Sequence, residues 1–315
     1  MDHSNFCIFS GTSYPALAQE IAGILNMEVS DATIKEFACG EIYVNLEESV
    51  RGKEVFIVQT TRTGCVNRDF MELFLLCDAA KRSFASKVHV VLPYYSYARQ
   101  DKIHAAREPI SARLFADLLV KSGADRIITT HLHSEQIQAF FSVPVDNLNA
   151  RRALAKIIQQ KNLIDPVIVS PDAGGAKMAK RFADEIGLPI AILHKTRPEH
   201  NVAEVTHIVG DIANKTPIIV DDMVDTAGSV CGAKQALIDK GARNEVYLVT
   251  THPVFSGPAI ERLKNADFKE IIVTNTLPLL EEQKIEGLTQ ISVAPLLAEV
   301  IKNTIENKSV SDLYF

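Results

Sequence analysis

The sequence lacks the features that mark disulfide-rich, secreted and membrane-spanning proteins. Its 315 residues include five cysteines, which are scattered and form no C-x-x-C pair, a pattern typical of reduced thiols and not of a disulfide framework or zinc ribbon. The longest apolar runs, such as 88–93 and 217–220, fall far short of the roughly 18 residues that cross a bilayer. No basic segment followed by an apolar one opens the chain, so no signal peptide is expected. We therefore expect a cytoplasmic protein without a membrane partner.

An excess of positive charge is also absent. The 33 Lys and Arg residues are outnumbered by 39 Asp and Glu residues, which gives a net charge of −6. This balance argues against nucleic acid or an anionic membrane surface as a general partner. The length predicts about two domains. No flexible linker or low-complexity segment separates them.

Short apolar runs alternate with helical segments along the whole chain. Several runs are continuous in Val and Ile, as expected for parallel strands that are covered on both faces. Helical periodicity is found at 109–122 and 228–240, and the two segments are followed by Gly123 and Gly241. The apolar stripe of the first helix is expected to consist of Ile110, Leu114, Leu118 and Leu119. The strands are expected at 7–9, 54–59, 87–92, 126–130, 166–170, 190–193, 217–220, 245–250 and 270–274. This alternation predicts an α/β fold with right-handed crossovers.

Two segments of the chain are similar to each other. Residues 121–131 and 240–252 each contain a helix end, a Gly-Ala turn, a strand and a terminal Thr-Thr-His. One interpretation is that any α/β protein repeats such units. The other is that the chain consists of two similar α/β domains, at 1–147 and 148–315. In a variant of this interpretation, the last residues of the second domain pack back on the first.

Segment 217–229 carries the most specific chemical signal. An apolar strand ends in two carboxylates, and a short turn with hydroxyl groups and a glycine leads into a helix. Free N–H groups at a helix start, together with hydroxyls, can bind a phosphate. The carboxylates can accept from sugar hydroxyls or hold Mg²⁺ through its waters, whereas helix capping alone would explain one Asp and one Thr. The residues concerned are Asp221, Asp222, Asp225, Thr226, Ala227, Gly228 and Ser229.

This segment resembles the phosphoribosyl-pyrophosphate (PRPP) motif of phosphoribosyltransferases and PRPP synthetases. Other segments resemble ribose-phosphate pyrophosphokinases of the class I type over nearly the whole chain. They are 97–101, 107–111, 136–141, 170–175, 256–259 and 309–315. The resemblance implies two phosphoribosyltransferase-type domains, each a mainly parallel sheet flanked by helices.

The resemblance also implies a reaction, in which the diphosphoryl group of MgATP moves to the C1 hydroxyl of ribose 5-phosphate and gives PRPP and AMP. The sequence contains no G-x-x-x-x-G-K-S/T loop, so other cations must hold the ATP phosphates. By resemblance these are Lys195 and Arg197, the catalytic pair, and Arg197 also contacts the ribose phosphate. The polar residues after them, 199–204, are expected to form a lid.

Further roles follow from the resemblance alone. His133 and Asp172 would bind Mg²⁺, with Mn²⁺ as an option, although imidazole is an unusual magnesium ligand. Arg99 and Gln100 would bind ATP. So would the segment Phe37, Cys39, Gly40 and Glu41, which in this family comes from a neighbouring subunit. A homo-oligomer, which in the family is a hexamer assembled from dimers, is therefore expected.

Several residues depart from the family pattern. His131 stands where an Asp is usual, and the pair His131-x-His133 raises Zn²⁺ or Mn²⁺ as an alternative metal. Cys39 replaces a polar side chain, and Ser229 replaces Thr. Ala106 replaces a Ser in the regulatory loop, which predicts weak activation by phosphate and weak inhibition by ADP.

Two other functions stay open. The departures are compatible with a catalytically weak or silent regulatory paralogue of PRPP synthetase. A phosphoribosyltransferase would use the same 217–229 loop but not the second α/β half or segments 97–101 and 195–197.

Overall fold

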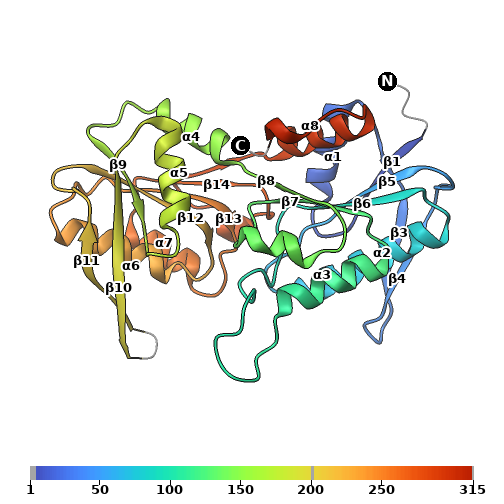
Figure 1. Ribbon diagram of the computed structural model, residues 1–315, viewed down its shortest axis with the longest axis horizontal. Coiled ribbons are helices and arrows are strands. Elements are labelled where there is room, and N and C mark those ends of the chain that lie inside the picture. Colours follow the sequence, from blue (N-terminus) through green and yellow to red (C-terminus); the bar gives the residue numbers. More distant parts are fainter. Residues whose placement is uncertain (1–4, 200–201, 314–315) are drawn as a thin grey trace. The chain divides into compact units, whose positions relative to one another are not determined.

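The structure is a computed structural model that describes residues 5–199 and 202–313. For 195–199, 202–206 and 312 only the backbone is described. The chain forms two compact units (Figure 1). The first consists of Met1–Asn149, Thr276–Pro278 and Val293–Phe315, and the second of Ala150–Asn275 and Leu279–Ser292.

The first unit is built on a six-stranded parallel sheet in the order β2-β1-β5-β6-β7-β8. Its strands are β1 (Phe6–Ser10), β2 (Val29–Ser30), β5 (Glu54–Val58), β6 (Lys87–Leu92), β7 (Arg126–Thr130) and β8 (Val145–Leu148). The central strands are buried along nearly their whole length, as their continuous Val and Ile runs require. Helices cover both faces (Figure 1). They are α1 (Pro15–Leu25) with α8 (Ala294–Ile305), and α2 (Val66–Arg82) with α3 (Ser111–Ser122). Short 3-10 turns occupy Glu135–Phe140 and Ser311–Leu313.

A separate antiparallel hairpin, β3 (Ala32–Glu36) and β4 (Ile42–Leu46), projects from this unit. Its inward side chains Ile34, Val44 and Leu46 pack against the core of the first unit. No continuous apolar run marks these two strands in the sequence, because their outer face is polar.

The second unit has a seven-stranded sheet in the order β11-β10-β9-β12-β13-β14-β15, in which only the β10–β11 pair is antiparallel. The strands are β9 (Pro166–Ser170), β10 (Ile190–Glu199), β11 (Val202–Val209), β12 (Thr216–Val224), β13 (Tyr247–Pro253), β14 (Glu270–Thr274) and β15 (Leu288–Ile291). Helices α4 (Arg151–Gln159) and α5 (Ala176–Ile186) pack together, as do α6 (Gly228–Asp239) and α7 (Ala259–Ala266). A 3-10 turn occupies Glu281–Gln283.

The predicted fold class is confirmed, but three local predictions were wrong. The strand expected at 190–193 continues to residue 199 as β10 and pairs with β11, and the expected lid at 199–204 includes residues 200–201, which lie outside the described part. Asp221 and Asp222 lie within β12 and not beyond its end. The side chains of Leu114 and Leu118 are largely exposed, because α3 turns Ala112, Ala116 and Leu119 to the core.

No helix within residues 5–199 and 202–313 combines the length and the apolar character needed to cross a membrane.

Candidate active-site residues in the two units

In the second unit, three adjacent strands carry the candidate residues near their carboxyl ends. Asp172 follows β9, the central one of the three. The 221–229 segment lies on β12 and the turn after it, and the backbone of Lys195 and Arg197 lies on β10, where Lys195 pairs with Val205. The strand order reverses between β9 and β12, and ligands of open α/β sheets bind at such switch points.

Asp172 is held in a tight turn before α5. Its Oδ1 atom accepts a hydrogen bond from the Gly175 N–H at 3.0 Å, and its carbonyl oxygen accepts from Ser170 Oγ at 2.7 Å. A Cβ atom at Gly174 would lie 3.2 Å from Asp172 Oδ1, and one at Gly175 would lie 3.0 Å from Ser170 Oγ. The glycines therefore allow the close approach that orients this carboxylate.

Negative charge is concentrated around Asp221. Burial, followed by the nearby Asp222 and Asp172 carboxylates, raises the pKa of Asp221 well above its usual range. The Asp222 N–H donates to Asp221 Oδ1 at 2.9 Å. A cation or a hydrogen-bond donor from a ligand would relieve this repulsion.

Within the described residues, no three His, Cys, Asp or Glu side chains form a direct metal-ligand set. Carboxylate oxygens, such as those of the second unit, suit a hard cation that keeps several of its waters, as Mg²⁺ does. The His131-x-His133 pair has no third such ligand in the described part of the chain.

The turn between β12 and α6 has the form of an anion site. Ala227 adopts a left-handed conformation with φ of 60°, and α6 begins at the next residue. Thr226, Gly228 and Ser229 are exposed at the start of α6, and the first N–H groups of a helix have no acceptor within the helix itself.

Two residues outside the predicted set support this turn. Ser256 Oγ donates to the Asp225 carboxylate, and the Ser256 N–H donates to Asp225 O at 3.0 Å. Arg262 Nη1 donates to Thr226 O at 3.0 Å. The 256–259 segment was part of the family resemblance, but nothing in the sequence indicated the role of Arg262.

In the first unit, candidates follow the adjacent strands β6 and β7. Arg99 and Gln100 are exposed in the loop after β6. Gln100 is fixed through its Oε1 atom, which accepts from Ser111 Oγ at 2.5 Å, and its carbonyl oxygen, which accepts from the Ala112 N–H at 3.2 Å. Tyr97, two residues before Arg99, has a φ of 65°, which is rare for a bulky side chain.

His133 is exposed after β7, while His131 is half-buried with a φ of 50°. The backbone between β7 and His133 is fixed by hydrogen bonds to Asn147 and Leu148, the last two residues of β8. The His131 N–H donates to Leu148 O at 2.8 Å, and the Leu132 N–H donates to Asn147 Oδ1 at 2.9 Å.

The remaining candidates occupy the tip of the β3–β4 hairpin, where Phe37, Cys39, Gly40 and Glu41 are all exposed. The tip is closed by the Phe37 N–H, which donates to Glu41 O at 2.8 Å, and by the Gly40 N–H, which donates to Phe37 O at 2.8 Å. Gly40 has a φ of 90°, a conformation that favours glycine. An exposed aromatic ring and carboxylate at such a tip can contact a base.

The candidates are thus divided between the units. Those expected to bind adenine and the metal at His133 belong to the first unit, and those expected to bind ribose 5-phosphate, the metal at Asp172 and the transferred phosphates belong to the second.

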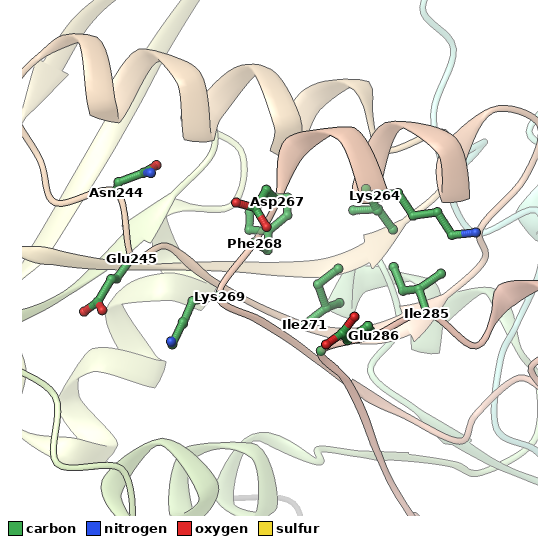
Figure 2. Close-up of a pocket in the computed structure, with 11 residues that line it drawn as sticks. Asn244, Glu245, Lys264, Asp267, Phe268, Lys269, Ile271, Ile285 and Glu286 are labelled. Carbon is green, nitrogen blue, oxygen red and sulfur yellow. The ribbon is translucent and has the colours of Figure 1, made fainter.

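A pocket elsewhere in the second unit contains none of these residues (Figure 2). It has a volume of about 740 Å³ and lies at the amino ends of β13, β14 and β15. Its lining mixes both charges around Phe268, with Lys264, Lys269 and Glu286 among the side chains. The candidate residues lie at the opposite, carboxyl ends of the strands.

Mainly parallel sheets flanked by helices, with polar loops at their carboxyl ends, define the chain as an α/β protein of the ligand-binding type. Comparisons with known proteins make this specific. The family model for the "N-terminal domain of ribose phosphate pyrophosphokinase" matches residues 6–123, and that for the "Phosphoribosyl synthetase-associated domain" matches 198–315.

Whole-chain relatives agree with these domain matches. Ribose-phosphate pyrophosphokinase of Bacillus subtilis (strain 168) is 49% identical over 310 residues, covering 98% of this chain and 97% of the relative. That of Bacillus caldolyticus is 48% identical over 307 residues, with 98% and 97% covered. The crystal structure of phosphoribosylpyrophosphate synthetase from Mycobacterium smegmatis matches with a TM-score of 0.91 and 44% identity, over 96% of this chain and 99% of that one. The chain belongs to the ribose-phosphate pyrophosphokinase family, and it is therefore an enzyme of the diphosphoryl-transferring class.

Proposed function

We propose that the chain catalyses the Mg²⁺-dependent transfer of the β,γ-diphosphoryl group of ATP to the C1 hydroxyl of ribose 5-phosphate, forming PRPP and AMP. The observation that carries the proposal is the arrangement at the carboxyl ends of the central strands in the second unit. There the β12–α6 turn, the carboxylates of Asp221 and Asp222, and Asp172 lie on neighbouring strands at a switch point. The names and high identity of the relatives support the same reaction.

Ribose 5-phosphate is bound by the β12–α6 turn. Its phosphate accepts from the first N–H groups of α6 and from the hydroxyls of Thr226 and Ser229, with Asp225 and Ala227 shaping the turn and Gly228 leaving space. Asp221 and Asp222 accept from the ribose hydroxyls, which reduces the repulsion between the two carboxylates. Arg197 provides a further positive charge for this substrate.

ATP is bound by residues of the first unit. Phe37 packs on the adenine and Glu41 accepts from its amino group, with Cys39 and Gly40 beside them. Arg99 and Gln100 contact the nucleotide from the loop after β6. His133 and Asp172 would each serve as a ligand for Mg²⁺, or Mn²⁺, together with waters, and the bound metal would neutralise charge on the ATP phosphates.

The transfer itself is mainly positioning and charge stabilisation. The C1 oxygen forms a bond to the β-phosphorus while the bond from that phosphorus to the bridging oxygen of AMP breaks. The hydroxyl proton is released to solvent, and AMP leaves with the bridging oxygen. Lys195 and Arg197 offset the negative charge that develops on the transferred group.

We further propose a cytoplasmic homohexamer in which the 37–41 tip serves a neighbouring subunit. The exposure of Phe37 supports this proposal, because a large aromatic side chain at a hairpin tip, with 54% of its surface exposed, is typical of a surface that contacts a partner or a ligand.

The test is to incubate the purified protein with Mg²⁺, ATP and ribose 5-phosphate and to measure AMP and PRPP. We expect both products in equal amounts. Lys195→Ala should lower kcat by orders of magnitude while ribose 5-phosphate binding, measured by calorimetry, survives. Near-normal kcat in this variant contradicts the assigned role. A wild-type protein that forms no AMP contradicts the proposed function and favours a regulatory paralogue, which the departures at Cys39, His131 and Ala106 would accommodate.

Regulation is expected to be weak. Ala106 is exposed in the loop after β6 and lacks the hydroxyl that would donate to a bound anion. Activation by inorganic phosphate should therefore be small, and Ala106→Ser should increase it. Strong phosphate activation of the wild-type protein contradicts this expectation.

A further inference from the structure

Arg68 lies in the first turn of α2 and contacts three parts of the first unit. Its Nη1 atom donates to Thr12 Oγ1 at 3.1 Å and to Glu72 Oε2 at 3.2 Å, and its Nε atom donates to Glu36 Oε2 at 3.1 Å. Thr12 follows β1, Glu72 lies one turn further along α2, and Glu36 is the last residue of β3. One guanidinium therefore connects the sheet, the helix and the hairpin.

The position of Arg68 is fixed from inside the protein. The Glu72 side chain is fully buried, and its carboxylate also accepts from the Thr12 N–H at 2.5 Å, from Thr12 Oγ1 at 2.7 Å and from Gln59 Nε2 at 2.9 Å. A buried carboxylate is stable only when it is paired and hydrogen-bonded, so Glu72 holds the Nη1 end of Arg68. Because the guanidinium is planar and rigid, this contact also sets the direction of Nε.

The hairpin depends on such contacts for its orientation. An isolated two-stranded hairpin is at best marginally stable in water. The β3–β4 pair packs on the core through Ile34, Val44 and Leu46, on its inner face. Glu36 stands directly before Phe37, at the point where the strand passes into the exposed tip. An ion pair at this residue therefore acts on the part of the hairpin that packing reaches least.

We propose that Arg68 is a positioning residue for the nucleotide: through Glu36 it holds the 37–41 tip in the orientation that binds ATP. Arg68 does not itself contact substrate. The proposal rests on the proposed function, because it takes the tip to be part of the ATP site.

The decisive variant is Glu36→Gln, because Glu36 is about half exposed and lies outside the buried Glu72 network. We expect it to raise KM for ATP, and the Kd for ATP measured by calorimetry, about three- to fivefold, the range of an exposed to half-exposed ion pair. The kcat and the KM for ribose 5-phosphate should stay within about twofold. Arg68→Gln should raise KM for ATP at least as much, and the double variant should add little to it, because both substitutions remove the same ion pair.

Arg82→Gln is the matched control. Arg82 lies at the other end of α2 in an exposed i,i+4 pair with Asp78, and we expect unchanged kinetic constants. An unchanged KM and Kd for ATP in Glu36→Gln overturns the proposal. The proposal is also overturned if Glu36→Gln lowers kcat and the melting temperature and raises both KM values together. That result would assign the pair a general structural role. A wild-type protein that makes no AMP contradicts the proposed function separately, and the calorimetric comparison of ATP binding still tests Arg68 in that case.

Discussion

The Asp172 carboxylate is expected to have both a structural and a catalytic role, and two substitutions of this residue can separate the two roles. Its Oδ1 atom accepts from the Gly175 N–H at 3.0 Å and closes the turn before α5. Its charge also contributes to the raised pKa of Asp221. Asn keeps an acceptor oxygen but removes the charge, whereas Ala removes both.

The expected magnitudes differ between these two variants. Asp172→Ala loses a hydrogen bond of the helix-capping kind, which costs about 1 kcal/mol and lowers the melting temperature by about 2–4 °C. Asp172→Asn should stay within about 0.5 kcal/mol of the wild type, because the hydrogen bond remains and the repulsion toward Asp221 falls. If Asp172 binds the metal, both variants should lose about a hundredfold or more in kcat/KM for ATP and should need more Mg²⁺ for half-maximal rate.

The assay combines thermal melting with AMP formation over a Mg²⁺ titration. Asp184→Asn is a suitable control, because Asp184 is an exposed carboxylate on α5 that pairs with Lys180. If Asp172→Asn retains wild-type turnover and Mg²⁺ dependence while Asp172→Ala loses activity in step with its melting temperature, the carboxylate only closes the turn. That result would refute its assignment to the metal.

Three other predictions test separate parts of the molecule. Burial and neighbouring carboxylates raise the pKa of Asp221 when the chain folds, so the stability that this group contributes is lost as the pH rises above its ordinary pKa of 3.8. The Asp221→Asn variant should therefore melt at a higher temperature than the wild type between about pH 4 and 7 without Mg²⁺. An unchanged melting temperature would contradict this. ATP should slow alkylation of the exposed Cys39 thiol, while Cys77, whose pKa burial raises to about 12, stays unreactive with or without ATP. If mass spectrometry shows the same rate of Cys39 alkylation with and without ATP, the tip is not part of the ATP site. Arg62→Ala should cost about 2–3 kcal/mol in urea denaturation, because it removes two hydrogen bonds from the fully buried Asp69 carboxylate; a cost below about 1 kcal/mol would mean that solvent reaches Asp69.

The parts of the fold that were predictable from the sequence are those in which burial decides the residue pattern. Strands β6, β7, β9 and β14 begin and end where the apolar runs do, because parallel strands covered on both faces need such runs. The β3–β4 hairpin was not predictable in this way, since only one of its faces is buried and its outer face is polar. In α3, leucines at 114 and 118 mimic a core stripe, yet the core contact is made by Ala112, Ala116 and Leu119.

The candidate site was predictable to a similar degree. The β12–α6 turn could be located because its residues are contiguous, and contiguous residues keep their relation whatever the tertiary structure. Arg262, Ser256 and the Arg68–Glu36 pair could not be located, because each acts on a residue about 30 positions away. Such contacts depend on how the elements pack, which periodicity does not specify.

The two units use the same topological feature in different ways. In the first unit the strand order reverses between β1 and β5, and there Gln59 occupies the space beside Gly11, where a Cβ atom would clash with Gln59 Oε1. Gln59 is completely buried, where it accepts from the Ser13 N–H and donates to Asp69 O and to Glu72 Oε1. In the second unit the corresponding reversal, between β9 and β12, leaves the Thr226 and Ser229 side chains exposed. A parallel sheet thus provides a polar position at each reversal, and the side chains decide whether the protein or a ligand fills it.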